Sequence, residues 1–139
     1  MKLFLDTNII MDFVKCREPF IYEALPLIQQ GEKGIHQLFI SDLTFVNVAY
    51  LSKKGLSLYQ LYEMLEEVYS LFEVVSIGKQ VIKMALDLKY TDFEDAVQYF
   101  SAKQANADCI ITRNKKDFTF SDIPVYTPAE FMENSLFTE

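Results

Sequence analysis

Short apolar runs alternate with helix-compatible segments along this 139-residue chain, and no linker divides them. Strands that alternate with helices in this way are typical of a parallel sheet with helices on both faces. The alternation therefore predicts a single α/β domain over residues 1–139, a three-layer α/β/α sandwich whose central, mostly parallel sheet has four or five strands. We expect strands over residues 2–5, 37–40, 72–75, 109–112 and around 125. We expect helices over residues 8–15, 19–30, 42–53, 57–70 and 79–88, from 91 onward, and from 127.

Capping signals and apolar periodicity support two of these helices in particular. Ser57-Leu58-Tyr59-Gln60 and Thr91-Asp92-Phe93-Glu94 each fit a capping box at a helix start. Such helices usually turn an apolar face to the core. The face in the first helix consists of Leu58, Leu61, Leu65 and Val68, and the face in the second consists of Phe93, Ala96, Val97 and Phe100.

The charge balance of the chain is acidic, with a formal net charge of -7 and a pI near 4.7. This balance argues against extended electrostatic capture of nucleic acid. A nucleic-acid substrate would have to be held by bound metal and a few local cations. The candidate cations are Lys53, Lys54, Arg113, Lys115 and Lys116.

Composition also excludes several classes of protein. No apolar run approaches the roughly 20 residues of a membrane-spanning helix, and the N-terminus reads as a first strand rather than a signal peptide. We therefore expect a cytoplasmic protein without a membrane partner. The two cysteines, Cys16 and Cys109, and the single histidine, His36, lack the spacing of zinc ligands. Cys109 is expected to be buried, Cys16 to be a partly exposed free thiol, and His36 to lie at a strand edge.

Acidic residues stand where ligands bind in this class of fold. Asp6 directly follows the first strand, Asp92 and Asp95 open a helix, and Asp117 lies beyond a later strand. The carboxyl ends of parallel strands border the ligand crevice. Carboxylates gathered there repel one another unless a hard cation neutralises them, which is typical of Mg²⁺- or Mn²⁺-dependent phosphodiester enzymes.

Each of these acids also has a purely structural interpretation. Asp6 could cap the helix that follows it, Asp92 could complement a helix dipole, and Asp117 could belong to a polar turn. Asp95 is the hardest to explain structurally, because it lies one turn further into its helix, beside the apolar face.

Four segments, in order, resemble the motifs of PIN domains, including those of VapC-like toxins. They are Leu5-Asp6-Thr7-Asn8-Ile9-Ile10, Ser41-Asp42-Leu43-Thr44-Phe45-Val46-Asn47, Asp92-Phe93-Glu94-Asp95-Ala96 and Thr112-Arg113-Asn114-Lys115-Lys116-Asp117-Phe118. The resemblance covers essentially the whole chain. It implies a PIN-like α/β/α sandwich and a metal-dependent ribonuclease that acts on RNA.

The resemblance also implies roles for particular residues. Asp6, Asp95 and Asp117 match the acidic positions that bind Mg²⁺ or Mn²⁺ and carry catalysis. The expected supporting residues are Asn8, Asn47, Asp92, Thr112 and Asn114. Asn47 is a departure, because many active members carry glutamate there. Its neutral amide would leave a second metal ion more weakly bound. Separately, Arg113 and Lys115 are candidates for holding a substrate phosphate.

VapC-like toxins often dimerise and are inhibited by a small antitoxin, so the resemblance implies a homodimer and an antitoxin partner. The helix over residues 57–70 is rich in tyrosine, with Tyr59, Tyr62 and Tyr69. Its apolar and aromatic face is wide enough that part of it could stay exposed as a patch on the surface. Such a patch would suit a homodimer surface or a groove for an antitoxin helix.

Three alternatives stay open at this stage. A phosphotransferase of the haloacid-dehalogenase kind also begins with an aspartate after a strand, but it normally has a second aspartate where Asn8 stands. A receiver-like signalling domain would bind Mg²⁺ beside a phosphorylatable aspartate, but its usual mid-chain acceptor is not found here. The third alternative is a catalytically weakened PIN-like module that binds RNA or protein.

Overall fold

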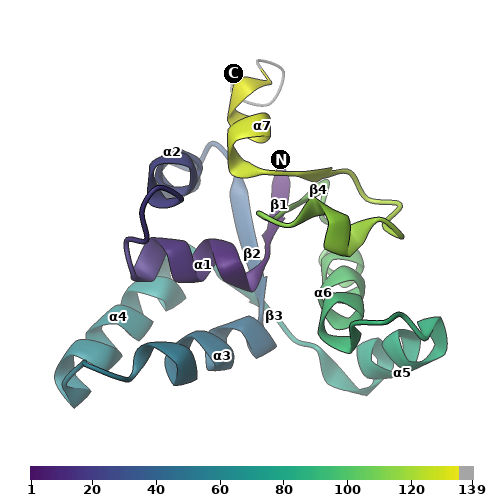
Figure 1. Cartoon of the computed structure of the whole chain (residues 1–139), viewed down its shortest axis with the longest axis horizontal. Helices are drawn as coiled ribbons and strands as arrows, with labels where there is room; N and C mark the ends of the chain where they lie inside the picture. Colours follow the sequence, from purple (N-terminus) through teal and green to yellow (C-terminus); the bar gives the residue numbers. More distant parts are fainter. Residues whose placement is uncertain (135–139) are drawn as a thin grey trace.

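The computed structural model describes residues 1–134, which form a five-stranded parallel sheet with helices on both faces (Figure 1). The strand order is β3-β2-β1-β4-β5. The strands are β1 (Lys2–Leu5), β2 (Gln37–Ser41), β3 (Glu73–Val75), β4 (Cys109–Ile111) and β5 (Val125–Tyr126). The predicted three-layer α/β sandwich is confirmed, and each predicted strand lies within one or two residues of its expected bounds.

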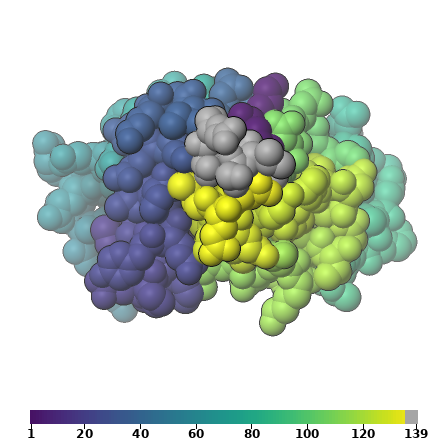
Figure 2. Space-filling view, turned by 90° about the horizontal axis from the view of Figure 1, so that it is seen from above, coloured from purple at the N-terminus to yellow at the C-terminus, as the bar shows by residue number. Residues whose placement is uncertain are grey.

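Helices connect the strands and cover the sheet unevenly. They are α1 (Thr7–Val14), α2 (Ile21–Glu32), α3 (Asp42–Ser52), α4 (Leu58–Leu71), α5 (Gly78–Leu88), α6 (Phe93–Gln104), the 3₁₀ helix η1 (Lys115–Phe118) and α7 (Pro128–Glu133). Figure 1 shows α1 to α4 on one side of the sheet and α5 and α6 on the other. Figure 2, a view from above, shows α7 in yellow against the dark blue segment that includes α2.

Alternating side chains of the central strand divide the core into two layers. Leu3 and Leu5 pack with helices on the α1–α4 side, whereas Phe4 packs with Tyr99 and Phe118 on the α6 side. All three β1 side chains are fully buried. A strand covered on both faces is apolar at successive positions, which is why this short run reads as continuously hydrophobic in the sequence.

The predicted helix starts and apolar faces were partly wrong. Ser57 caps α4 with a complete capping box, as expected, but the N-cap of α6 is Asp92 rather than Thr91. Leu58 was expected on the buried stripe of α4 and is 75% exposed, and Phe93 on α6 is also exposed. In both cases the residue lies in the first turn of its helix, where the predicted apolar face does not reach the core.

The register of the sheet places the candidate site. Leu5 of β1 is paired with Ile111 of β4, so the residues that follow the two strands, Asp6 and Thr112, emerge side by side. The backbone N–H of Asp6 donates to the Ile111 carbonyl at 2.9 Å. Ser41, the last residue of β2, ends on the same edge of the sheet.

The cysteines and the histidine lie where the sequence placed them. Cys109 is buried and Cys16 is exposed, and neither is in a disulfide. His36, directly before β2, is buried against the edge of the Phe131 ring. Within residues 1–134, no helix combines the length and the apolar character that crossing a bilayer requires.

Candidate active site

Asp6 is a buried carboxylate at the carboxyl end of the central strand. Its Oδ1 atom accepts hydrogen bonds from the Thr7 backbone N–H at 2.9 Å and from Gln98 Nε2 at 3.3 Å. Its Oδ2 atom accepts from Thr112 Oγ1 at 2.9 Å. Burial raises the pKa of Asp6 above its usual value, and these hydrogen bonds only partly oppose that effect. Asp6 is also the N-cap of α1, so the structural and functional interpretations are compatible.

Gln98 on α6 connects Asp6 to the ends of two other elements, and the sequence did not single it out. Its side chain is almost fully buried. Its Oε1 accepts from Ser41 Oγ at 2.6 Å, and its Nε2 donates to Thr44 Oγ1 at 2.9 Å as well as to Asp6. Thr44 in turn lies 2.8 Å from Thr7 Oγ1. This buried network links β1, β2, α3 and α6 around the Asp6 carboxylate.

The predicted acids line one cleft beside Asp6. The cleft has a volume of about 370 Å³. Its acidic lining consists of Asp6, Asp92, Glu94, Asp95 and Asp117. Asp6 follows β1, the next three open α6, and Asp117 lies in η1, so three distant segments contribute. Glu94 was not a predicted site residue, and only its place inside the third motif could have indicated it.

The acids of the cleft oppose one another's ionisation. Burial, and then the negative charges of Asp92, Asp6, Asp117 and Glu94, raise the pKa of Asp95 from 3.8 to about 7. Burial and the charges of Asp6 and Asp92 also raise the pKa of Glu94. Asp92 accepts a hydrogen bond from the Asp95 backbone N–H at 3.1 Å, so it caps α6 while its charge acts on Asp95.

Three of the predicted supporting residues meet at the ends of β1 and β4. Asn8 Nδ2 donates to Thr112 Oγ1 at 3.4 Å, and the Asn114 backbone N–H donates to the same oxygen at 3.1 Å. Asn8 Oδ1 accepts from the Arg113 backbone N–H at 3.4 Å. Asn8 and Asn114 line the cleft, whereas the fully buried Thr112 supports Asp6 from behind it.

The structure separates the other predicted residues. Arg113 lines the cleft, together with Arg17, which the sequence did not indicate. Lys115 instead forms an exposed ion pair with Glu130 at 3.0 Å. Asn47 is half-buried on α3 and is not among the residues that line the cleft. Asp42, in the second motif, does not line the cleft either. Its carboxylate accepts a hydrogen bond from the Ile77 backbone N–H at 3.3 Å.

The donor set of the cleft fits a hard divalent cation. Carboxylate and amide oxygens are the ligands that Mg²⁺ and Mn²⁺ prefer, and mutual repulsion among these acids would be relieved by a bound positive charge. Within residues 1–134, however, no three His, Cys, Asp or Glu side chains lie close enough together to enclose a metal ion as they stand. Binding an ion would therefore draw the carboxylates toward one another.

The raised pKa of Asp95 predicts how stability depends on pH in EDTA. Between its ordinary pKa near 3.8 and its folded pKa of about 7, the folded chain holds a proton that the unfolded chain has released. The free energy of unfolding should therefore fall as pH rises through about 7, by an amount on the order of 1 kcal/mol because Asp95 is partly exposed. Urea unfolding from about pH 5 to about pH 8 measures this slope, and an equally steep slope in Asp95→Asn would contradict it.

Comparison with known protein families shows the family of this chain. The PIN domain profile matches residues 2–116, so the chain belongs to the PIN domain family. None of the curated proteins compared with the chain matches it.

Solved toxin–antitoxin complexes contain chains of the same fold. The chain is similar to one in VapBC2 from Rickettsia felis bound to a promoter DNA fragment, with 18% identity, a TM-score of 0.69 and coverage of 91% of this chain and 98% of that chain. It is similar to one in VapBC-1 from nontypeable Haemophilus influenzae, with 20% identity, a TM-score of 0.69 and coverage of 92% and 98%. It is also similar to one in a toxin–antitoxin complex from Klebsiella pneumoniae, with 28% identity, a TM-score of 0.67 and coverage of 92% and 98%.

Proposed function

We propose that this PIN domain, extending over residues 1–139, is a divalent-metal-dependent ribonuclease and the toxin of a toxin–antitoxin pair. The observation that carries the proposal is the gathering of Asp6, Asp95 and Asp117 from three distant segments into one cleft. The charges of Asp6 and Asp117 act on the ionisation of Asp95, which is expected of acids that share one site. Membership in the PIN family favours this proposal over a phosphotransferase or a receiver domain.

The roles of the residues follow from their positions. Asp6 and Asp95 would hold a Mg²⁺ or Mn²⁺ ion, and Asp117 would bind it through water or help to hold a second ion. Such an ion supplies charge to polarise a phosphoryl oxygen and to activate a water molecule for in-line attack. Thr112 and Gln98 fix the orientation of Asp6 by donating hydrogen bonds to its two oxygens.

The similarity to chains of toxin–antitoxin complexes supports an antitoxin partner for this chain. The α3–α4 face supports it as well, because it exposes large apolar side chains around a cavity of about 270 Å³. The cavity is lined by Phe45, Tyr62, Leu65, Glu66 and Tyr69. Exposed apolar surface of this kind suits an antitoxin helix or a second copy of the chain.

The direct test is cleavage of a mixed RNA pool by the purified protein while Mg²⁺ or Mn²⁺ is titrated from zero. We expect cleavage that rises with metal and stops when EDTA is added. A parallel pool of single-stranded DNA reports the nucleic-acid preference. RNA that stays intact at millimolar metal, with the protein folded by circular dichroism, would reject the nuclease assignment.

A second candidate function is favoured by Asn47. It offers no carboxylate, and it does not line the cleft. A PIN domain weakened in this way would bind RNA or a protein partner without cutting RNA. RNA binding that is unaffected by metal and produces no fragments in the same titration would support this alternative.

A further inference from the structure

Asp12 is a buried carboxylate that the proposed chemistry does not use. It lies on α1, six residues after Asp6, and it is fully buried. Its Oδ2 atom lies 2.7 Å from Arg113 Nε, and its Oδ1 atom lies 3.1 Å from Arg17 Nε. A buried carboxylate needs such partners, because an unpaired charge in the interior is very costly. Asp12 therefore holds Arg113 by a hydrogen bond and lies within ion-pair distance of Arg17, which comes from a different segment of the chain.

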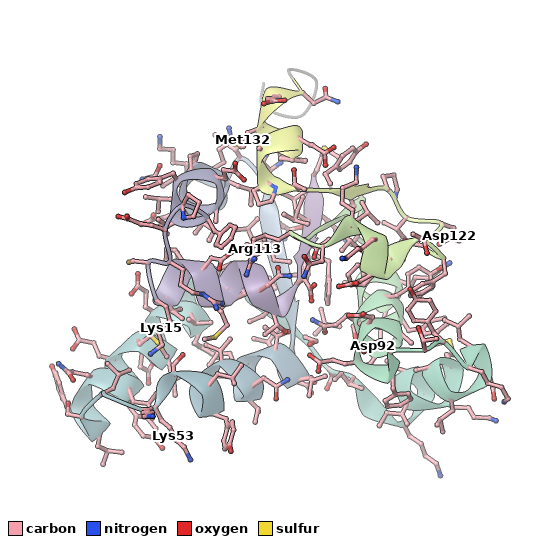
Figure 3. The ribbon with its side chains drawn as sticks, viewed as in Figure 1. Lys15, Lys53, Asp92, Arg113, Asp122 and Met132 are labelled. Atoms are coloured by element: carbon pink, nitrogen blue, oxygen red, sulfur yellow. The ribbon has the colours of Figure 1, made fainter. Side chains whose placement is uncertain are left out.

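Arg113 is held on a second side as well. The centre of its guanidinium lies 3.9 Å from the centroid of the Phe20 ring, a cation–π contact. In Figure 3, Arg113 lies over α1 and Asp92 lies at the start of α6, and both residues line the same cleft. A guanidinium held by a carboxylate and an aromatic ring loses little conformational freedom when it binds a ligand.

Both arginines keep hydrogen-bond donors available to the cleft. Arg113 donates to Asp12 through Nε, and the atom of Arg17 that faces Asp12 is also Nε. The terminal Nη groups of Arg17 and Arg113 can therefore donate to a ligand. One carboxylate between two guanidinium groups also leaves one net positive charge beside an otherwise acidic cleft.

We propose that Arg17 and Arg113, positioned by Asp12, form a binding site for a backbone phosphate of RNA next to the phosphate that is attacked. The site rests on the proposed ribonuclease function and deepens it. Guanidinium groups match the geometry of phosphate oxygens. The acids of the cleft and the net charge of -7 repel a polyanion, so a fixed local cation pair is what retains the strand.

The test measures RNA binding in a background that does not depend on chemistry. A labelled single-stranded RNA of mixed sequence is titrated in EDTA with Asp6→Asn, alone and combined with Arg113→Met or Arg17→Met. Each arginine substitution should weaken binding about tenfold and lower the salt dependence of binding, log K against log salt, by about 0.7. Arg113→Lys should restore the salt dependence but not the full affinity, because lysine lacks the fork of donors that arginine presents.

The matched control is Lys83→Met, which removes the same charge from an exposed lysine that pairs with Asp87 on α5 and does not line the cleft. It should leave affinity within about twofold of Asp6→Asn alone. Equal RNA affinity in the arginine and Lys83 variants would overturn the proposal. The binding assay does not depend on cleavage, so the two proposals can fail separately. If the parent protein does not cut RNA, but Arg113→Met weakens its RNA binding, the nuclease function is rejected and the phosphate site is supported.

Discussion

Asp6→Asn is expected to reduce metal-dependent RNA cleavage by more than about 100-fold while the protein stays folded. Residues that merely orient a metal ligand are commonly worth 10- to 100-fold, and Asp6 is proposed as a ligand itself. Asparagine keeps two of the local contacts, because its oxygen can accept from Thr7 and Gln98, but it removes the acceptor for the Thr112 hydroxyl. Initial cleavage rates across a Mn²⁺ titration measure the effect.

The stability of the same variant separates function from folding. Burial raises the pKa of Asp6, so folding disfavours the charged form of this carboxyl group. Asp6→Asn should therefore stay folded near pH 8 in EDTA, because the removal of a buried charge offsets the loss of the acceptor for Thr112. Asp87→Asn, an exposed acid paired with Lys83 on α5, is the matched control and should cleave at the parent rate. Cleavage by Asp6→Asn at the rate of that control would refute the proposed role of Asp6.

Gln98→Met is expected to lower both stability and activity. Methionine has a similar size but cannot donate to Asp6 or accept from Ser41, so buried polar groups lose their partners. A loss of about 1–3 kcal/mol in the free energy of unfolding follows from that change. Cleavage should fall about 10- to 100-fold, because the Asp6 carboxylate loses a group that orients it.

The control for this variant lies in the same helix. Gln104, the last residue of α6, lies outside the cleft and donates to the Ser76 carbonyl at 2.5 Å. Gln104→Met should retain full cleavage. If Gln98→Met were destabilised but cut RNA at the parent rate, Gln98 would be a structural residue only, with no part in orienting Asp6.

The fold could be predicted because its signals are local. Each strand is a short apolar run, and most helices begin at a recognisable capping residue, so boundaries fell within a few residues. The N-cap of α6 was placed one residue early because Thr91 and Asp92 are both good caps. In the structure Asp92 is the N-cap, because its carboxylate accepts a hydrogen bond from the Asp95 backbone N–H. The predicted buried face of α4 wrongly included Leu58. The spacing of apolar residues does not show that the first turn of this helix lies away from the core.

The candidate site was predictable only where a residue type stands out at a strand end or a helix start. Asp6, Asp95 and Asp117 met that condition, and the structure lines one cleft with them. Gln98 and Asp12 did not, because a polar residue inside a helix usually faces water. Their burial depends on contacts with Ser41 and with Arg113, which lie 57 and 101 positions away in the chain. Sequence spacing carries no information on such contacts.

The order of segments along the chain has a consequence for biosynthesis. Asp6 is made first, but β4, the strand that pairs with β1 on the side of Thr112, and Asp117 are made more than 100 residues later. A nascent polypeptide therefore cannot assemble the centre while residue 117 is still inside the ribosome. If the protein is a ribonuclease toxin, the message and the ribosome that produce it are protected until residue 117 has left the ribosome, and an inhibitor already present can bind before the first cut.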